Sequence, residues 1–249
     1  MPTNHAILSA SSSHRWLECP PSAKLCAELP DTSSEYAQEG TDAHALCEHR
    51  LKALLGRETT DPTENLTYYN EEMERCAVEY ATYAYEQVKK AKVACNDPIV
   101  LIEQKLDFSR WVPEGFGTGD CVIVADGTLS VIDFKYGKGV EVRAENNPQM
   151  MLYALGALEL FDGIYDISAV NMIIFQPRRD NISEYAISKE ELLRWANEIL
   201  TPTAQLAANG DGDFKAGKHC RFCKVRATCR KLAEYNLALA RYDFEPPAP

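Results

Sequence analysis

The sequence lacks long apolar runs. No window approaches the roughly 18 consecutive apolar residues that a membrane-spanning helix needs. Residues 1–13 contain no basic segment followed by an apolar stretch, so they do not match the pattern of a signal peptide. We therefore expect a cytoplasmic protein, in a bacterium or in the host of a phage, with no membrane partner.

The sequence also lacks an excess of positive charge. It has 26 lysines and arginines against 37 aspartates and glutamates, which gives a formal net charge of −11. Phosphate binding needs local positive potential, so this balance counts against nonspecific adhesion to nucleic acid. Any nucleic acid must be contacted by a patch, and the densest basic stretch is 215–231. We select from it the DNA-binding candidates Lys224, Arg226 and Arg230, although such a run is more often only a solvated surface.

A disulfide framework is not expected either. The nine cysteines are an odd number, and thiols stay reduced in the cytoplasm, so metal binding is the better use of any clustered subset. Isolated cysteines are more often small buried hydrophobes. We assign that role to the scattered ones, which are Cys26, Cys47, Cys76, Cys95 and Cys121.

The clustered cysteines are Cys220, Cys223 and Cys229, which place three thiolates in one short loop. The fourth ligand must come from elsewhere, and we select Cys19 because Pro20 follows it and makes the thiol rigid. Cys26 is the competing choice, and His219 would complete a zinc site without a remote partner. The spacing does not separate zinc from an iron–sulfur cluster.

The pattern of apolar residues predicts a mixed α/β fold with one central sheet and mostly antiparallel strands. We expect helices over 33–55, 71–94, 147–161 and 188–208, and strands over 99–108, 120–125, 129–134 and 169–175. The last helix begins with the capping box of Ser188 and Glu191. We expect a single domain over 1–240, with a helical part (10–95), a core (96–208) and a cysteine segment (215–233), followed by a proline-rich tail (241–249).

Two acidic residues and a lysine are predicted to meet on this sheet. Asp120 should open one strand and Asp133 should end its hairpin partner, while Lys135 shares a face with Asp133. Carboxylates hold Mg²⁺ or Mn²⁺, and a nearby cation offsets charge that develops on a phosphate. A strand-end salt bridge explains Asp133 and Lys135 equally well on spacing alone. A second Asp-x-Lys, over 213–215, lies in a glycine-rich loop, where no strand would direct its side chains to a common site.

Four other residues favour a metal site over a salt bridge. His44 follows Gly40 near the start of a helix, Glu103 lies inside an apolar strand, and Gln149 and Tyr153 share one helix face. Each also has an ordinary structural explanation: His44 as a structural histidine on a helix, Glu103 as the ion-pair partner of Lys105 or another neighbour, and Tyr153 as a core residue.

In this order the motifs Gly40-x-x-x-His44, Gly119-Asp120, Asp133-Phe134-Lys135 and Gln149-x-x-x-Tyr153 resemble those of the RecB-type PD-(D/E)XK nucleases, with phage-encoded relatives most similar. The resemblance runs from residue 11 to 229. It implies a restriction-endonuclease-like mixed sheet flanked by helices, with a [4Fe–4S] cluster that joins the two ends of the chain. The implied roles are metal ligands (His44, Asp120, Asp133, the Phe134 carbonyl and additionally Glu103), an orienting lysine (Lys135), its supports (Gln149, Tyr153) and cluster ligands (Cys19, Cys220, Cys223, Cys229).

The function that this resemblance implies is a Mg²⁺- or Mn²⁺-dependent DNA exonuclease that acts on ends in recombination, repair or replication. Its partners would be single-stranded or end-containing duplex DNA, and a single-strand-binding or recombination protein. Stacking partners for a single strand would be Trp16, Trp111, Phe116 or Tyr136. Tyr136 stands where many relatives have a small hydroxyl residue. The alternatives are a noncatalytic DNA-binding or assembly module with the same fold, and a zinc-stapled interaction protein.

Overall fold

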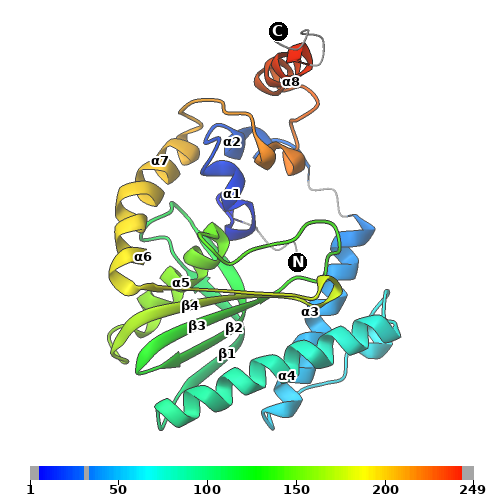
Figure 1. The fold of residues 1–249 in the computed structure, drawn as a ribbon, viewed down its shortest axis with the longest axis vertical. Coiled ribbons are helices and arrows are strands. Elements are labelled where there is room, and N and C mark those ends of the chain that lie inside the picture. The colour runs from blue at the N-terminus through cyan, green and yellow to red at the C-terminus, as the bar shows by residue number, and fades with distance from the viewer. Residues whose placement is uncertain (1–5, 31–33, 243–249) are drawn as a thin grey trace, which may run out of the picture.

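The computed structural model describes residues 6–30 and 34–242, and a five-stranded sheet lies at its centre (Figure 1). The strands follow one another in space as in sequence: β1 (Ile99–Asp107), β2 (Phe116–Ala125), β3 (Gly127–Phe134), β4 (Ile167–Gln176) and β5 (Asn181–Ser188). Neighbours are antiparallel except β3 and β4, which are parallel. The mixed α/β fold and the mostly antiparallel sheet are thus confirmed.

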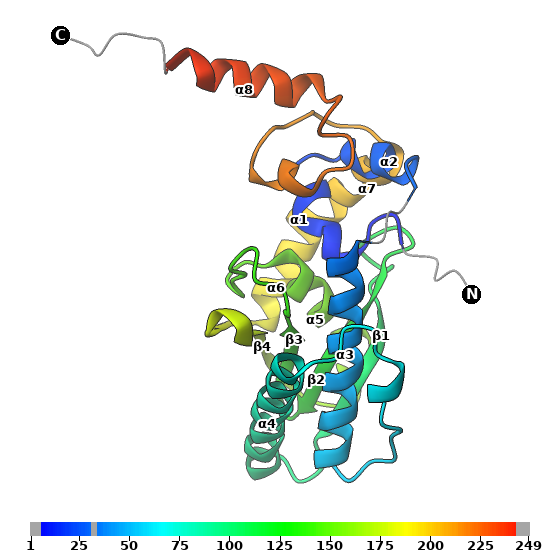
Figure 2. The same cartoon turned by 90° about the vertical axis from the view of Figure 1, so that its right-hand side faces the viewer.

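Helices cover both faces of the sheet (Figures 1 and 2). One face carries α3 (Glu35–Leu54) and α4 (Glu71–Ala94), and the other carries α5 (Pro148–Phe161), α6 (Lys189–Trp195) and α7 (Thr201–Asn209). The short helices α1 (Ser13–Trp16) and α2 (Ser22–Ala27) lie at one end of the molecule, beyond which α8 (Arg230–Tyr242) extends. None of the described helices is long and apolar enough to cross a membrane.

Alternation along the central strands explains this layering. Val122 and Val124 of β2 pack into the core beneath α5, whereas Cys121 and Ile123 point to the core beneath α4. Successive side chains on a strand face opposite sides, so both faces of β2 must be apolar. The sheet therefore has two hydrophobic cores.

Helix α5 provides the crossover that the parallel pair of β3 and β4 requires. Its N-terminus is fixed by Asn147, whose side chain accepts hydrogen bonds from the backbone N–H groups of Gln149 and Met150, and by Pro148 in the first turn. The helix packs closely on β1 at Gly156, where an added Cβ would lie 2.9 Å from the Leu106 Cβ. This packing places the first turn of α5 beside the end of β3.

The structure corrects several expected boundaries. Asp120 lies in the middle of β2 and does not open the strand. Strand β5 was not predicted, because its alternately half-buried and exposed residues form an edge without an apolar run. The helix over 188–208 contains a π-helical turn, Ala196–Leu200, between α6 and α7, and its capping box of Ser188 and Glu191 is confirmed.

The chain ends also differ from expectation. Helix α8 continues through residues 241 and 242, which we had placed in the proline-rich tail. The remainder of that tail, 243–249, and the predicted helix start at residue 33 lie outside the described residues. The other predicted helices and strands are confirmed within a few residues.

Two helical glycines give opposite predictions for stability. Gly156→Ala would press a methyl group against Leu106 and the Asp107 backbone, so we expect the free energy of unfolding to fall by about 1–3 kcal/mol. A Cβ at Gly40 in α3 meets nothing within 4 Å, so Gly40→Ala should stabilise by up to about 1 kcal/mol through helix propensity. Urea unfolding of the two variants measures both changes, and an unchanged or raised stability of Gly156→Ala would contradict the close packing.

Candidate functional site

Asp120 and Asp133 lie side by side on the two central strands. The register pairs Cys121 of β2 with Ile132 of β3, so the next position places Asp120 beside Asp133. Both side chains point toward α5, because they alternate with Cys121 and Ile132, which face the opposite core. Asp120 is 8% exposed and Asp133 is 2% exposed. The sequence predicted this juxtaposition, although it misplaced Asp120 along its strand.

The first turn of α5 holds Asp133 and Lys135 together. Gln149 donates from Nε2 to Asp133 Oδ1 at 3.2 Å, and its Oε1 accepts from Lys135 Nζ at 3.1 Å. The same Nε2 lies 3.1 Å from the Tyr153 hydroxyl. The backbone N–H of Lys135 donates to the Phe175 carbonyl, which fixes the end of β3 against β4. Gln149 is therefore the residue that connects the lysine, the aspartate and the tyrosine.

Asp133 forms a buried ion pair with Lys135. Lys135 Nζ lies 2.8 Å from Oδ2, although the contact is not aligned as a hydrogen bond. The ammonium compensates the charge of Asp133, and the carboxylate oxygens keep lone pairs that a cation can share.

The second part of the site joins three elements at the same end of the sheet. His44 of α3 places Nδ1 3.3 Å from Asp120 Oδ1 and 3.9 Å from Glu103 Oε1. The three residues offer ligand atoms within 4.8 Å of one another. The other oxygen of Asp120 accepts a hydrogen bond from the Phe134 N–H at 2.7 Å. Among the described residues, no other group of His, Cys, Asp or Glu is so compact.

Glu103 has a strained backbone. Its φ is +49°, in the left-handed region that costs a residue with a Cβ, and the pairing of β1 with β2 is interrupted at this position. The expected structural alternative, an ion pair with Lys105, does not occur; the Lys105 ammonium lies over the Phe116 ring, 4.5 Å from its centroid. The distorted backbone places the Glu103 carboxylate beside His44.

Burial and mutual charge shift the pKa values of this site in different directions. Burial raises the pKa of Asp133, and the nearby Lys135 ammonium offsets this only in part. Burial also opposes ionisation of Asp120, yet the charge and hydrogen bond of His44 keep the pKa of Asp120 below its usual value. Burial and the Asp120 carboxylate raise the pKa of Glu103 to about 7. Burial lowers the pKa of His44, but the nearby carboxylates outweigh this effect and raise its pKa to about 9.

These residues fit a hard divalent cation. Mg²⁺ and Mn²⁺ prefer carboxylate oxygens, and the group formed by His44, Glu103 and Asp120 offers two carboxylates. Asp133 does not belong to this compact group, but the strand register places it beside Asp120. Burial and the neighbouring Asp120 carboxylate both disfavour ionised Glu103, and a cation would remove the repulsion between the acidic groups.

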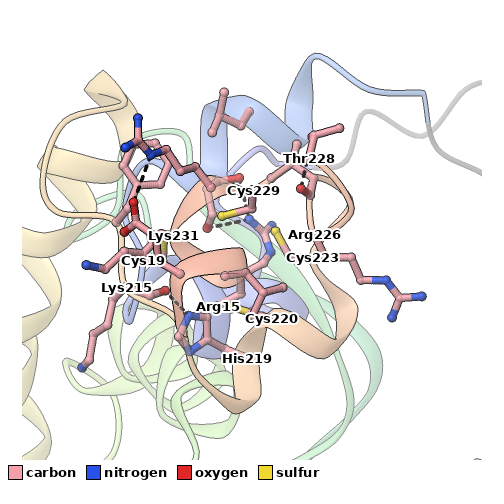
Figure 3. Close-up of a pocket in the computed structure, with 17 residues that line it drawn as sticks. Arg15, Cys19, Lys215, His219, Cys220, Cys223, Arg226, Thr228, Cys229 and Lys231 are labelled. Atoms are coloured by element: carbon pink, nitrogen blue, oxygen red, sulfur yellow. Dashed lines mark hydrogen bonds and ion pairs between the residues drawn. The ribbon is translucent and has the colours of Figure 1, made fainter. Parts of the chain in front are cut away.

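The four predicted cluster cysteines lie around one cavity of about 510 Å³ (Figure 3). Cys19 comes from the segment between α1 and α2, and Cys220, Cys223 and Cys229 come from the segment that precedes α8. The structure thus brings together residues about 200 positions apart in the sequence. We call this space the cysteine cavity.

The alternative ligands also lie close to this cavity. Cys26 does not line it, but its sulfur is 3.8 Å from that of Cys223. His219 lines it and has Nε2 2.9 Å from the Lys215 carbonyl. Cys26, Cys47, Cys76, Cys95 and Cys121 are all buried, as predicted for scattered cysteines.

The basic candidates have different surroundings. Arg226 and Arg230 line the cysteine cavity and are exposed, whereas Lys224 does not line it and donates to the Leu29 carbonyl. Two residues of this region were not selected from the sequence. Arg15 lines the cavity from α1, and Lys215 lines it from the loop of the second Asp-x-Lys. Arg15 has no sequence signal, whereas Lys215 begins the basic stretch 215–231; the fold brings both to the cysteines.

The expected stacking aromatics are mostly wrong. Trp16, Trp111 and Tyr136 are at most 4% exposed and belong to the interior, and Phe116 is half-buried. Half-buried Trp195 instead lines a second cavity of about 580 Å³. We call it the Trp195 cavity; its wall includes His14, Asn146, Pro148, Lys215 and Lys218. It borders the residue that precedes Gln149, so it adjoins the first turn of α5.

The fold and these residues define a mixed α/β protein with a buried acidic centre suited to a metal ion. The chain belongs to the family described as "Protein of unknown function (DUF2800)", whose model matches residues 5–249. It is similar to a solved structure described as "Putative exonuclease" from Eubacterium rectale, with 11% identity over 90% of this chain and 88% of that one and a TM-score of 0.46. It is also similar to the protein SSO0001, with 15% identity over 75% of this chain and 95% of that one and a TM-score of 0.31. Both TM-scores are below 0.5, so neither similarity assigns a function to this chain.

The raised pKa values predict how metal affinity depends on pH. His44 and Glu103 must both lose a proton to bind a cation, so Mn²⁺ affinity should rise with pH. The rise should be about tenfold per pH unit between pH 7 and 9, where His44 deprotonates, and steeper below pH 7, where Glu103 is also protonated. Calorimetric titration with Mn²⁺ measures this. Glu103→Gln should remove the steeper part, and an affinity independent of pH would contradict the assignment of these ligands.

Proposed function

We propose that this protein is a metal-dependent DNA nuclease that hydrolyses phosphodiester bonds. The observation that carries the proposal is the compact group of His44, Glu103 and Asp120, with the buried pair of Asp133 and Lys135 beside it on the next strand. Phosphodiester hydrolysis needs oxygen ligands for a divalent cation and a positively charged group close to the reacting phosphate. The motif resemblance to RecB-type nucleases supports the same reaction.

Each residue has a defined part in this proposal. Asp120, Asp133, His44 and Glu103 would hold Mg²⁺ or Mn²⁺, which when bound polarises the phosphate and lowers the pKa of a coordinated water. Lys135 would orient the attacking water and offset charge on the phosphate. Its ammonium is held between Asp133 and Gln149, so it needs no rearrangement before the reaction. Tyr153 acts through Gln149 and is a positioning residue.

The substrate we propose is a DNA end, in single-stranded or end-containing duplex DNA. The Trp195 cavity supports a path for one strand, because it combines a partly exposed indole with the cationic side chains of Lys215 and Lys218. A base can stack on an aromatic ring while lysines contact the phosphates, which is how single strands are bound without sequence preference. This cavity adjoins the α5 turn that carries Gln149. Exonucleolytic action and a role in recombination, repair or replication follow from the motif resemblance alone.

The cofactor that we propose for the cysteine cavity is a [4Fe–4S] cluster. Four thiolates on a single zinc at about 2.3 Å would lie about 3.8 Å apart. Among the described residues no three cysteine sulfurs form a group within 4.8 Å, and the Cys26 and Cys223 sulfurs lie 3.8 Å apart. A cluster gives each thiolate its own iron and so suits more widely spaced sulfurs around a cavity of about 510 Å³. Such a group would connect the segment of Cys19 to that of Cys229.

Cleavage of DNA tests the proposed activity. Asp133→Asn removes the charge of the buried carboxylate, and Lys135→Met removes the ammonium with little change in length. We expect each to reduce the rate of nucleotide release from end-labelled linear DNA at least about 100-fold with Mg²⁺ or Mn²⁺. Closed circular DNA, single-stranded and duplex, should resist the wild-type protein if it acts only on ends.

The matched control is the exposed ion pair of Lys189 and Asp162, 2.9 Å apart. Asp162→Asn and Lys189→Met make the same chemical changes on the surface, and both variants should cleave like the wild type. Wild-type protein that binds DNA but releases no nucleotide with either metal would contradict the proposal and favour a noncatalytic DNA-binding module.

The proposed strand path gives a separate prediction. Trp195→Ala removes the stacking surface and should weaken binding of a short single strand about 5- to 100-fold, in line with about 1–3 kcal/mol for one stacked base. Mn²⁺ affinity should not change, because Trp195 does not belong to the metal-binding group. Fluorescence anisotropy with a labelled oligonucleotide measures the first quantity. Trp111→Phe is a control in the buried core, and equal affinities for Trp195→Ala and the wild type would refute the path.

A further inference from the structure

We infer that Arg15 is the buried counter-charge of an anionic metal–thiolate group in the cysteine cavity. This inference rests on the metal–thiolate group proposed above, and it assigns a role to a residue outside the ligand set. Arg15 lies in α1 and is 8% exposed. Figure 3 shows it among Cys19, Cys220, Cys223 and Cys229.

The surroundings of Arg15 leave its charge without a negative partner. Its Nη1 donates to the Ser22 carbonyl at 2.7 Å and to the Ser22 hydroxyl at 2.8 Å, and both acceptors are neutral. No carboxylate of the described residues lies within 4.0 Å of the guanidinium. Burying a charged guanidinium without a negative partner is costly.

The walls of the cavity show the same imbalance. Its lining includes five cationic side chains and one carboxylate: Arg15, Lys215, Arg226, Arg230, Lys231 and Glu234. The whole chain has a net charge of −11, so this local excess is opposite to the general composition. The carboxylate of Glu234 is 2.9 Å from Arg230, and Lys215 pairs with Glu18 outside the cavity. Arg15 is the buried member of the set and the others are more exposed.

An anionic occupant resolves both observations. Four thiolates around Zn²⁺ or around a doubly charged iron–sulfur core leave about two net negative charges. Arg15 would then offset part of this charge in a region of low dielectric constant. The positive charge of Arg15 would stabilise bound thiolates, and it would also favour the addition of an electron to a cluster.

Metal retention in a charge series tests this role without any DNA. The protein is loaded anaerobically with iron and sulfide, or with Zn²⁺, and metal and sulfide are measured during competition with a chelator. Arg15→Gln should weaken retention about 10- to 100-fold, as is typical when a residue that supports metal ligands is lost. Arg15→Lys keeps the charge and should stay within about threefold of the wild type.

Two further variants separate charge from local structure. Ser22→Ala removes one acceptor of Arg15 but no charge, and Arg226→Gln removes a charge from the exposed rim. Both should retain metal like the wild type. For an iron–sulfur cluster, the midpoint potential of Arg15→Gln should also become more negative, where tenfold in the one-electron equilibrium corresponds to about 59 mV.

Three results would overturn the inference. The first is equal retention in Arg15→Gln and Arg226→Gln. The second is an equal loss of metal from folded Arg15→Lys and Arg15→Gln, which would assign the effect to the hydrogen bonds with Ser22. If Arg15→Gln does not fold, a loss of metal from Arg15→Lys would overturn the inference by itself. The third is wild-type protein that retains neither iron nor zinc, and this result would leave the nuclease activity of the carboxylate residues to be judged separately by cleavage.

Discussion

The structure depends on the close approach of two buried carboxylates, Asp120 and Asp133, on its two central strands. Like charges at this depth repel each other and lose their hydration, so the fold must supply compensation from several directions. Lys135 and Gln149 provide it for Asp133, and His44 and the Phe134 N–H provide it for Asp120. The position of α5 against the end of β3 and the position of α3 against β2 both serve this arrangement. Glu103 adds a third carboxylate beside His44 and Asp120, and a cation would compensate this further negative charge.

A buried charge also needs compensation at the other end of the molecule, but there the charge is positive. The cysteine cavity has a buried guanidinium and a cationic rim in an acidic protein, so it is short of negative charge. The acidic centre is short of positive charge once His44 and Glu103 have lost their protons, the state that binds a cation. Each region would be neutralised by a metal-containing group of the appropriate net charge, a free divalent cation in one and a metal–thiolate anion in the other. The Trp195 cavity shares Lys215 and His219 with the cysteine cavity and borders the turn that carries Gln149, so it connects the two regions.

Much of this arrangement could be predicted from the sequence because the signals are local. Hydrophobic periodicity predicts α4 and α5 closely, and the Asp126-Gly127 turn predicts the hairpin that aligns Asp120 with Asp133. The (i, i+4) spacing of Gln149 and Tyr153 predicts their contact. The features that could not be predicted depend on tertiary structure. Strand β5 has no apolar run, the left-handed backbone of Glu103 has no sequence signal, and Arg15 becomes important only where α1 packs beside the cysteine segment. Burial of Trp16 and Trp111 is likewise decided by packing.

The central claim is that Asp133 and Asp120 share a divalent cation. Crystals of the protein grown with Mn²⁺ and measured at a wavelength where manganese scatters anomalously would locate the ion directly. We expect one anomalous peak that lies about 2.0–2.3 Å from an oxygen of each aspartate. Lys135 should lie beside the ion, and the Oδ2 of Asp133 should be among its ligands. A peak elsewhere, or none at a Mn²⁺ concentration that saturates binding in solution, would show that Asp133 is only the structural partner of Lys135.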